Sequence, residues 1–174
     1  MTNETGNCPA LRQTEHVIRR LNMQERMGNP ALVIPDAMQA LNALGKLPAT
    51  AGLAPGFLEI IYLRASQING CSVCIDGHWR IARKHGETDE RLFAVAGWRE
   101  APYYSDAERA ALALAEAVTR LSDRADPVPD EVWEECTRHY DGKSLAALVI
   151  AIANINVWNR LNVATRQVAG QWKP

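Results

Sequence analysis

Two cysteines separated by two residues, Cys71 and Cys74, are the side chains of this sequence best suited to chemistry. Such a pair can cycle between dithiol and disulfide, because a sulfenic acid formed on one sulfur by a peroxide is captured by the other. An external dithiol then regenerates the pair by exchange. His78 follows Cys74 by four residues, so on a helix the imidazole lies one turn from that sulfur. This spacing indicates a thiol redox centre.

Glu59 is the one charged residue between Ala51 and Leu63, and its apolar neighbours predict that it is at least partly buried. It lies about as far before the Asn69-Gly70 pair as His78 lies after it. If the chain turns back on itself at this pair, Glu59 and His78 face each other across a helical hairpin. Together they could remove the proton of the attacking thiol.

The elements that must position these residues are helices. No run of alternating apolar and polar residues flanked by hairpin turns indicates a strand, so the predicted fold class is all-α, a single-domain helical bundle. One helix is expected to begin at Pro55 and to end at Asn69-Gly70, and the next to begin near Cys71. Both cysteines then lie in a first turn, where unpaired backbone N–H groups favour a thiolate.

Four further helices are expected along the rest of the chain. The first begins at Thr88 and runs through Trp98, and the second begins at the capping box Ser105 to Glu108. A short helix then runs through Trp133, and a long final helix begins at about Ser144. The last of these is apolar on more than one face, so we expect it at the centre of the bundle or at a subunit interface.

Composition argues against several classes of partner. The 174 residues suit one domain, and the formal net charge of -1 offers no general attraction to nucleic acid or to anionic membranes. The polar start, Met1 to Ala10, has no secretory signal, and the apolar run Leu145 to Ala153 is too short to span a bilayer. We therefore expect a cytoplasmic protein without nucleic-acid or membrane partners, where a close cysteine pair indicates catalysis, redox sensing or metal binding.

Structural explanations of the same residues stay open. The cysteine pair could be two buried small side chains, or half of a metal site, although Cys8 and Cys136 are isolated and do not complete a second half. Glu59 could instead form a buried ion pair with Arg64 or Arg160.

Other polar and aromatic residues receive weaker predictions. Tyr62 follows Glu59 on its helix face and could line a pocket or belong to the core. Asn156 and Asn159 lie in an apolar helix, where they are expected to fix packing or subunit register. The tryptophans are expected in the core or at an interface. Three histidines without clustered partners are expected at the surface or at helix ends: His16, His85 and His139.

The motif from Leu63 to His78, with Glu59 twelve residues before Cys71, resembles the core of the AhpD-like alkylhydroperoxidases of the carboxymuconolactone decarboxylase superfamily. The resemblance covers about residues 53–166, which leaves residues 1–52 as a helical N-terminal extension. It implies an all-α fold assembled into trimers or hexamers. It also implies peroxidase or disulfide-reductase activity without a bound metal or organic cofactor.

Carried over from this family, Cys74 attacks the peroxide and Cys71 resolves the product, with His78 and Glu59 as the proton relay. The implied substrate is hydrogen peroxide, an organic hydroperoxide or a small disulfide. The implied reductant is a dithiol, either a lipoyl-bearing protein or a thioredoxin-like protein. One departure concerns Val73, since well-known members have a histidine immediately before the second cysteine. This departure leaves peroxidase and disulfide-reductase activity both open.

Two other classes of function use the same residues differently. A lyase or isomerase of the decarboxylase type would act on a carbonyl-containing small molecule through Glu59 and His78, and would not need the cysteines. A redox sensor or zinc-binding interaction protein would need the cysteines but no substrate pocket.

Overall fold

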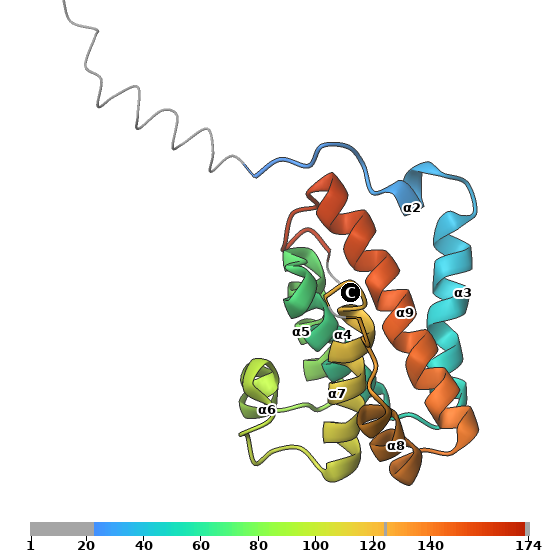
Figure 1. Ribbon diagram of the computed structural model, residues 1–174. Helices are drawn as coiled ribbons and strands as arrows, with labels where there is room; N and C mark the ends of the chain where they lie inside the picture. Colours follow the sequence, from blue (N-terminus) through green and yellow to red (C-terminus); the bar gives the residue numbers. More distant parts are fainter. Residues whose placement is uncertain (1–22, 124, 173–174) are drawn as a thin grey trace, which may run out of the picture.

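The computed structural model describes residues 23–123 and 125–172, and this part of the chain consists of helices and loops without a strand (Figure 1). The predicted all-α class is confirmed. Cys8, His16 and the first part of the N-terminal extension lie outside the described residues. The elements in chain order are α2 Pro30–Val33, α3 Ala37–Thr50, α4 Pro55–Asn69, α5 Ser72–Lys84, α6 Asp89–Ala94, the 3-10 turn η1 Val95–Gly97, α7 Asp106–Thr119, α8 Asp130–His139 and α9 Gly142–Thr165.

The helical hairpin α4–α5 forms where the sequence predicts it. Pro55 occupies the first turn of α4, and Gly70 ends that helix in the left-handed conformation, with φ of 67°, which glycine adopts without a steric penalty. Cys71 follows in extended conformation as the N-cap of α5. The bend therefore places Cys71 and Cys74 at the start of α5, directly beside the end of α4.

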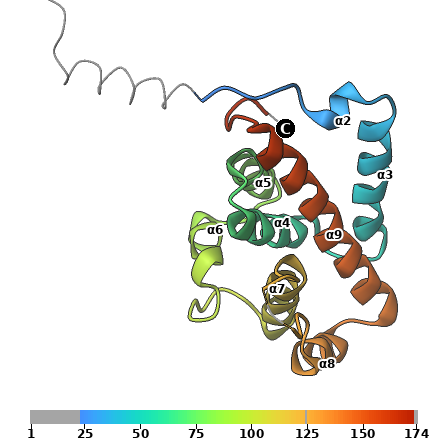
Figure 2. The ribbon, with the colours of Figure 1, turned by 45° about the horizontal axis from the view of Figure 1, so that its top comes forward.

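The helix α9 lies between the other helices. In both views it runs between α3 on one side and α4, α5 and α7 on the other (Figures 1 and 2). Leu148 and Ile152 are fully buried, which confirms the expected central position. With 24 residues and a mean hydropathy of 1.3 over an 18-residue stretch, α9 is long and apolar enough to cross a membrane, unlike the shorter run Leu145 to Ala153 considered above. Half of that stretch is buried inside the protein, and the core helix of a soluble protein can have the same length and hydropathy.

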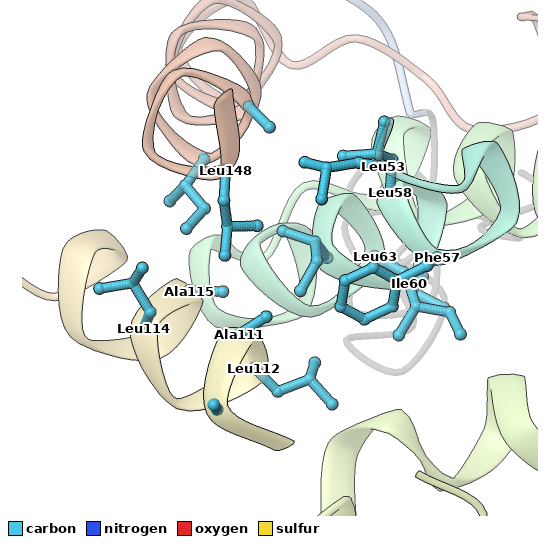
Figure 3. Packing of buried hydrophobic residues seen from close by; sticks show 14 of the residues in the cluster. Leu53, Phe57, Leu58, Ile60, Leu63, Ala111, Leu112, Leu114, Ala115 and Leu148 are labelled. Carbon is cyan, nitrogen blue, oxygen red and sulfur yellow. The ribbon is translucent and has the colours of Figure 1, made fainter. Parts of the chain in front are cut away.

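The apolar core fills the space between α4, α7 and α9. Figure 3 shows its buried side chains, among them Phe57, Ile60, Leu63, Leu112, Leu114 and Leu148. Burying one such side chain contributes about 1.5–3 kcal/mol, so this cluster holds α4 rigidly in place. A rigid α4 gives the site that it carries a fixed geometry.

A cluster of amides ties α9 to the bend of the hairpin. The side-chain amide of Asn69 donates to Asn156 at 2.9 Å and to Asn159 at 2.8 Å. Asn159 in turn donates to Ser66 at 3.0 Å, and Asn156 donates to Thr119 at 3.1 Å. These buried amides are satisfied by partners on other helices, as their predicted packing role requires.

One predicted helix is shorter than expected. We expected a regular helix from Thr88 through Trp98, but α6 ends at Ala94 and continues only as a 3-10 turn to Gly97. Tighter 3-10 turns are common at helix ends. Trp98 then turns inward and donates its indole N–H to Glu116 at 2.9 Å.

The buried carboxylate of Glu116 on α7 accepts hydrogen bonds from several side chains. Arg64 contacts one carboxylate oxygen at 2.6 Å, and Arg99 donates to the other at 2.8 Å. Burial raises the pKa of Glu116, but the hydrogen bonds from Arg99, Trp98 and Arg64 outweigh burial and lower the pKa from 4.5 to about 2.

This lowered pKa predicts a contribution of Glu116 to acid stability. Because the unfolded carboxyl takes up its proton at about pH 4.5, the stabilisation is present above that pH and is lost as the pH falls towards about 2. The loss amounts to roughly 3 kcal/mol. The free energy of unfolding, measured with urea at several pH values in this range, should fall more steeply with decreasing pH for the native protein than for Glu116→Gln. Equal slopes for the two proteins would contradict the prediction.

Candidate active site

The centre of the site is a disulfide between Cys71 and Cys74, whose sulfur atoms lie 2.22 Å apart. The two residues are 1% and 2% exposed. Cys74 lies in the first turn of α5, where the unpaired backbone N–H groups favour a thiolate once the disulfide is reduced. Cys136, the free cysteine among the described residues, is different: it is buried in the core, and burial raises the pKa of its thiol to about 11.

Glu59 and His78 meet across the hairpin, as predicted. Nδ1 of His78 lies 2.6 Å from Oε2 of Glu59, and each side chain is 12% exposed. With Nδ1–H donating to the carboxylate, Nε2 of the neutral imidazole is left as a proton acceptor. The arginine pairing considered for Glu59 is wrong, because Arg64 pairs with Glu116 and Arg160 donates to the main-chain oxygen of Asn156.

Tyr62 stands beside this pair and lines the site. Its ring centroid lies 5.1 Å from that of His78. Burial and the charge of Glu59 raise the pKa of Tyr62 above its ordinary value, so its phenol stays protonated in the physiological range. Both positions considered for Tyr62 are observed, because the residue lines the pocket and also packs against the core.

Trp172 is a second aromatic neighbour of His78, in an edge-on arrangement at a centroid distance of 5.6 Å. The segment after α9 folds back over α5, and the backbone N–H of Gly170 donates to Asp76 at 3.1 Å. The indole of Trp172 rests directly on Gly77, where a Cβ atom would come within 1.9 Å of the ring. Gly77 therefore provides the space in which Trp172 sits.

Replacing Gly77 by alanine should displace this tryptophan. Alanine favours the helical backbone by about 1 kcal/mol over glycine, so α5 should remain intact while the indole moves outward. Acrylamide should then quench Trp172 fluorescence more strongly. The control is Gly77→Ala in a Trp172→Ala background, where the extra quenching should vanish. Unchanged quenching in Gly77→Ala alone would show that the indole does not occupy this position in solution.

A cavity of about 730 Å³, here called the Cys74 cavity, opens beside Cys74 and His78. Its size lies within the range typical of sites for small organic molecules. Much of its wall is apolar or aromatic and comes from α3, α5 and α9 and the segment after α9: Met38, Leu41, Ile81, Ile155, Trp158 and Trp172.

A smaller cavity of about 330 Å³, here called the Cys71 cavity, lies on the Cys71 side. Its lining includes Cys71, Ser72 and Arg166. Both cavities share a wall that contains Val73 and Asn162. The two cysteines of the disulfide therefore line different cavities.

Asn162 of α9 is a neighbour of the disulfide that the sequence analysis missed. Its side-chain amide nitrogen donates to the sulfur of Cys74 at 3.3 Å. Its side-chain oxygen accepts from Asn29 at 2.7 Å. An asparagine in an apolar helix needs polar partners, which is the signal that could have drawn attention to it. Among the residues that the structure describes, no group of three or more His, Cys, Asp or Glu side chains could hold a metal ion.

Comparison with known sequences finds relatives of this chain. The family model of the carboxymuconolactone decarboxylases matches residues 35–117. The uncharacterised protein YdfG of Bacillus subtilis is 37% identical over 132 residues, which cover 76% of this chain and 88% of YdfG. The uncharacterised protein YnjA of Escherichia coli is 33% identical over 113 residues, which cover 64% of this chain and 60% of YnjA.

Comparison with solved structures finds the same fold. A protein of unknown function from Agrobacterium tumefaciens, described as a candidate antioxidant defence protein AhpD, is 34% identical with a TM-score of 0.78. The match covers 86% of this chain and 100% of that protein. The debrominase Bmp8 is similar in fold, with a TM-score of 0.70 at 24% identity, over 79% of this chain and 73% of Bmp8.

Proposed function

Because this chain belongs to the carboxymuconolactone decarboxylase family and carries a C-x-x-C disulfide, we propose that it is a thiol-dependent oxidoreductase. It reduces hydrogen peroxide, organic hydroperoxides or small disulfides through Cys71 and Cys74. The observation that carries this proposal is the position of the pair, at the first turn of α5 and beside a cavity that also contains His78. A redox role is what this family and this pair support together.

In the peroxidase reaction, the Cys74 thiolate attacks the terminal oxygen of the hydroperoxide. The O–O bond breaks, the sulfur becomes a sulfenic acid, and the alcohol leaves after taking up a proton. Cys71 then attacks the sulfur of Cys74 and releases water, which leaves the disulfide seen here. Reduction by a dithiol returns two electrons and two protons to the pair.

The proton path is assigned to His78 and Glu59. Nε2 of His78 takes the proton of the Cys74 thiol, and the Glu59 carboxylate stabilises the resulting imidazolium at a distance of 2.6 Å. The same imidazolium can return the proton to the leaving alkoxide. This assignment compensates for Val73, which offers no proton at the position where well-known family members have a histidine.

The test of the proposal is a count of free thiols in freshly reduced protein during titration with oxidants. Hydrogen peroxide, cumene hydroperoxide and oxidised glutathione form the panel, because they separate the peroxidase from the disulfide-reductase reaction. Both thiols of the pair should disappear with at least one of them, and dihydrolipoamide or reduced thioredoxin should restore them. If no oxidant removes the thiols, the proposed function fails.

The partners are part of the same proposal. The reductant is a dithiol on a lipoyl-bearing or thioredoxin-like protein, because its second thiol can release the first from a mixed disulfide. We also propose a homo-oligomer, a trimer or hexamer, in the cytoplasm. Apolar side chains of α2 and its surroundings support association, since Leu32, Val33 and Ile34 are all exposed.

A second candidate, a lyase or isomerase of the decarboxylase type, is favoured by one observation. His78, which is paired with Glu59, and Tyr62 line the Cys74 cavity, and they could move protons on a carbonyl compound without the cysteines. This candidate predicts that the double variant Cys71→Ser with Cys74→Ser keeps its activity. The proposed oxidoreductase requires that this variant is inactive.

A further inference from the structure

The sulfur of Cys74 has a hydrogen-bond donor that the proton relay does not use. Nδ2 of Asn162 lies 3.3 Å from it, although the two residues are separated by 88 positions in the chain. An N–H group that points at a sulfur favours its negatively charged form. Cys71 has no such partner at the helix end, because its side chain makes no capping hydrogen bond although it occupies the N-cap position.

The direction of this hydrogen bond is fixed by the backbone. A side-chain amide can present either its oxygen or its NH2 group to a neighbour. The backbone N–H of Ala31 can only donate, and it donates to Oδ1 of Asn29 at 2.9 Å. Asn29 must therefore turn its NH2 group towards Asn162, whose oxygen accepts at 2.7 Å. Asn162 is left with its NH2 group facing Cys74.

We propose that Asn162 is a catalytic residue that stabilises the Cys74 thiolate, and that Asn29 is a positioning residue that holds the Asn162 amide in the required direction. The inference rests on the proposed function, because it names the group that activates the attacking sulfur. Asn162 supplies to Cys74 a fixed hydrogen-bond donor from the opposite helix. His78 supplies the proton transfer.

A stabilised Cys74 thiolate also determines how the disulfide is reduced. In thiol–disulfide exchange the better leaving thiolate departs faster, so attack is directed at the other sulfur. A reductant thiolate therefore bonds to the sulfur of Cys71, the bond between Cys71 and Cys74 breaks, and its electron pair stays on Cys74. The second thiol of the reductant then attacks the reductant sulfur, which frees Cys71 and completes the two-electron transfer.

This assignment gives the Cys71 cavity a ligand class, a thiol of the reductant. Cys71 lines that cavity of about 330 Å³ together with Ser72 and Arg166, whereas Cys74 lines the larger cavity. The oxidising substrate and the reductant therefore approach the disulfide from different sides.

The first test measures thiolate formation at Cys74 directly. The ultraviolet absorbance of thiolate is followed against pH in Cys71→Ser, and the signal of the double cysteine variant is subtracted. Asn162→Leu should raise the midpoint by about one pH unit. Asn29→Ser, which keeps a good N-cap residue for α2, should raise it by less. Gln39→Leu removes an exposed amide that lines neither the Cys74 cavity nor the Cys71 cavity, and should leave the midpoint unchanged.

A near-isosteric variant keeps this test decisive if Asn162→Leu does not fold. Asn162→Asp retains the oxygen that accepts from Asn29 and replaces the donor with a second oxygen, so its midpoint should rise further. An unchanged midpoint in the folded Asn162 variants overturns the assignment. The measurement needs no peroxide turnover, so an inactive protein with the expected shift would refute the proposed function and leave the role of Asn162 standing.

The second test identifies the attacked sulfur. Oxidised protein is mixed with reduced glutathione, quenched with acid, alkylated with N-ethylmaleimide and mapped by mass spectrometry. Glutathione should be found mainly on Cys71, with N-ethylmaleimide on Cys74. Glutathione mainly on Cys74 would overturn the proposed direction of attack. In Asn162→Asp the preference for Cys71 should fall.

Discussion

Replacing Cys74 by serine should lower kcat/KM for the active oxidant roughly a thousandfold or more, because a serine hydroxyl cannot form the sulfenic acid. Cys71→Ser should behave differently. Without added thiol, its Cys74 should still react once with peroxide, and the sulfenic acid should persist because the resolving thiol is missing. Steady-state assays measure the loss in Cys74→Ser, and trapping with dimedone in the absence of any added thiol, which would itself reduce the sulfenic acid, identifies the intermediate in Cys71→Ser.

Cys136→Ser is the matched control for these variants. Cys136 is fully buried, and its thiol donates to the main-chain oxygen of Ala110, a bond that a serine hydroxyl can also make. Its activity should equal that of the unmodified protein. Undiminished turnover in Cys74→Ser would exclude Cys74 as the nucleophile, and dimedone on Cys71 instead would reverse the assigned order of the cysteines.

The hairpin that carries the site could be predicted because its signals are local. Pro55 and Gly70 mark the ends of α4 by their own backbone preferences, and the bend at Gly70 follows from them. Once the bend is known, equal distances along the two helices place Glu59 opposite His78. The spacing of these residues along the chain is therefore enough to predict the contact across the hairpin.

Asn162 and Trp172 could not be predicted in the same way. Asn162 reaches Cys74 from a helix 88 residues further along the chain, and its side chain is oriented by Asn29 from a third segment. Trp172 reaches His78 because the chain after α9 folds back over Gly77. No periodicity or motif encodes contacts of this kind. They depend on how α9 packs against the hairpin, which is a property of the whole core.

The same limit explains why an arginine partner for Glu59 stayed open beside the predicted pairing with His78. Arg64 lies on the same helix as Glu59, which made an ion pair plausible from spacing alone. In the folded protein Arg64 instead points towards α7, where it contacts Glu116 at 2.6 Å. Arg64 could pair with Glu59 or with Glu116, and the tertiary arrangement of α4 and α7 determines that it pairs with Glu116.

Replacing His78 by glutamine should lower kcat/KM at neutral pH about a hundredfold or more, which is the usual contribution of a positioned general base. The loss should shrink as the pH rises, because hydroxide can then remove the thiol proton in place of the imidazole. Glu59→Gln should have a smaller effect in the same direction. It leaves the imidazole in place and removes only the charge that stabilises its protonated form.

The double variant of Glu59 and His78 decides whether the two residues act as one relay. In the proposed relay Glu59 acts on the reacting sulfur only through His78, since the carboxylate binds Nδ1 of the imidazole at 2.6 Å. Glu59→Gln should therefore cost nothing further once His78 is replaced, and the double variant should match His78→Gln within a factor of about two. Multiplying effects would mean that Glu59 acts on the substrate directly, as the lyase alternative requires. Non-additivity, together with loss of turnover in Cys74→Ser, would join the carboxylate, the imidazole and the sulfur in a single path for the proton.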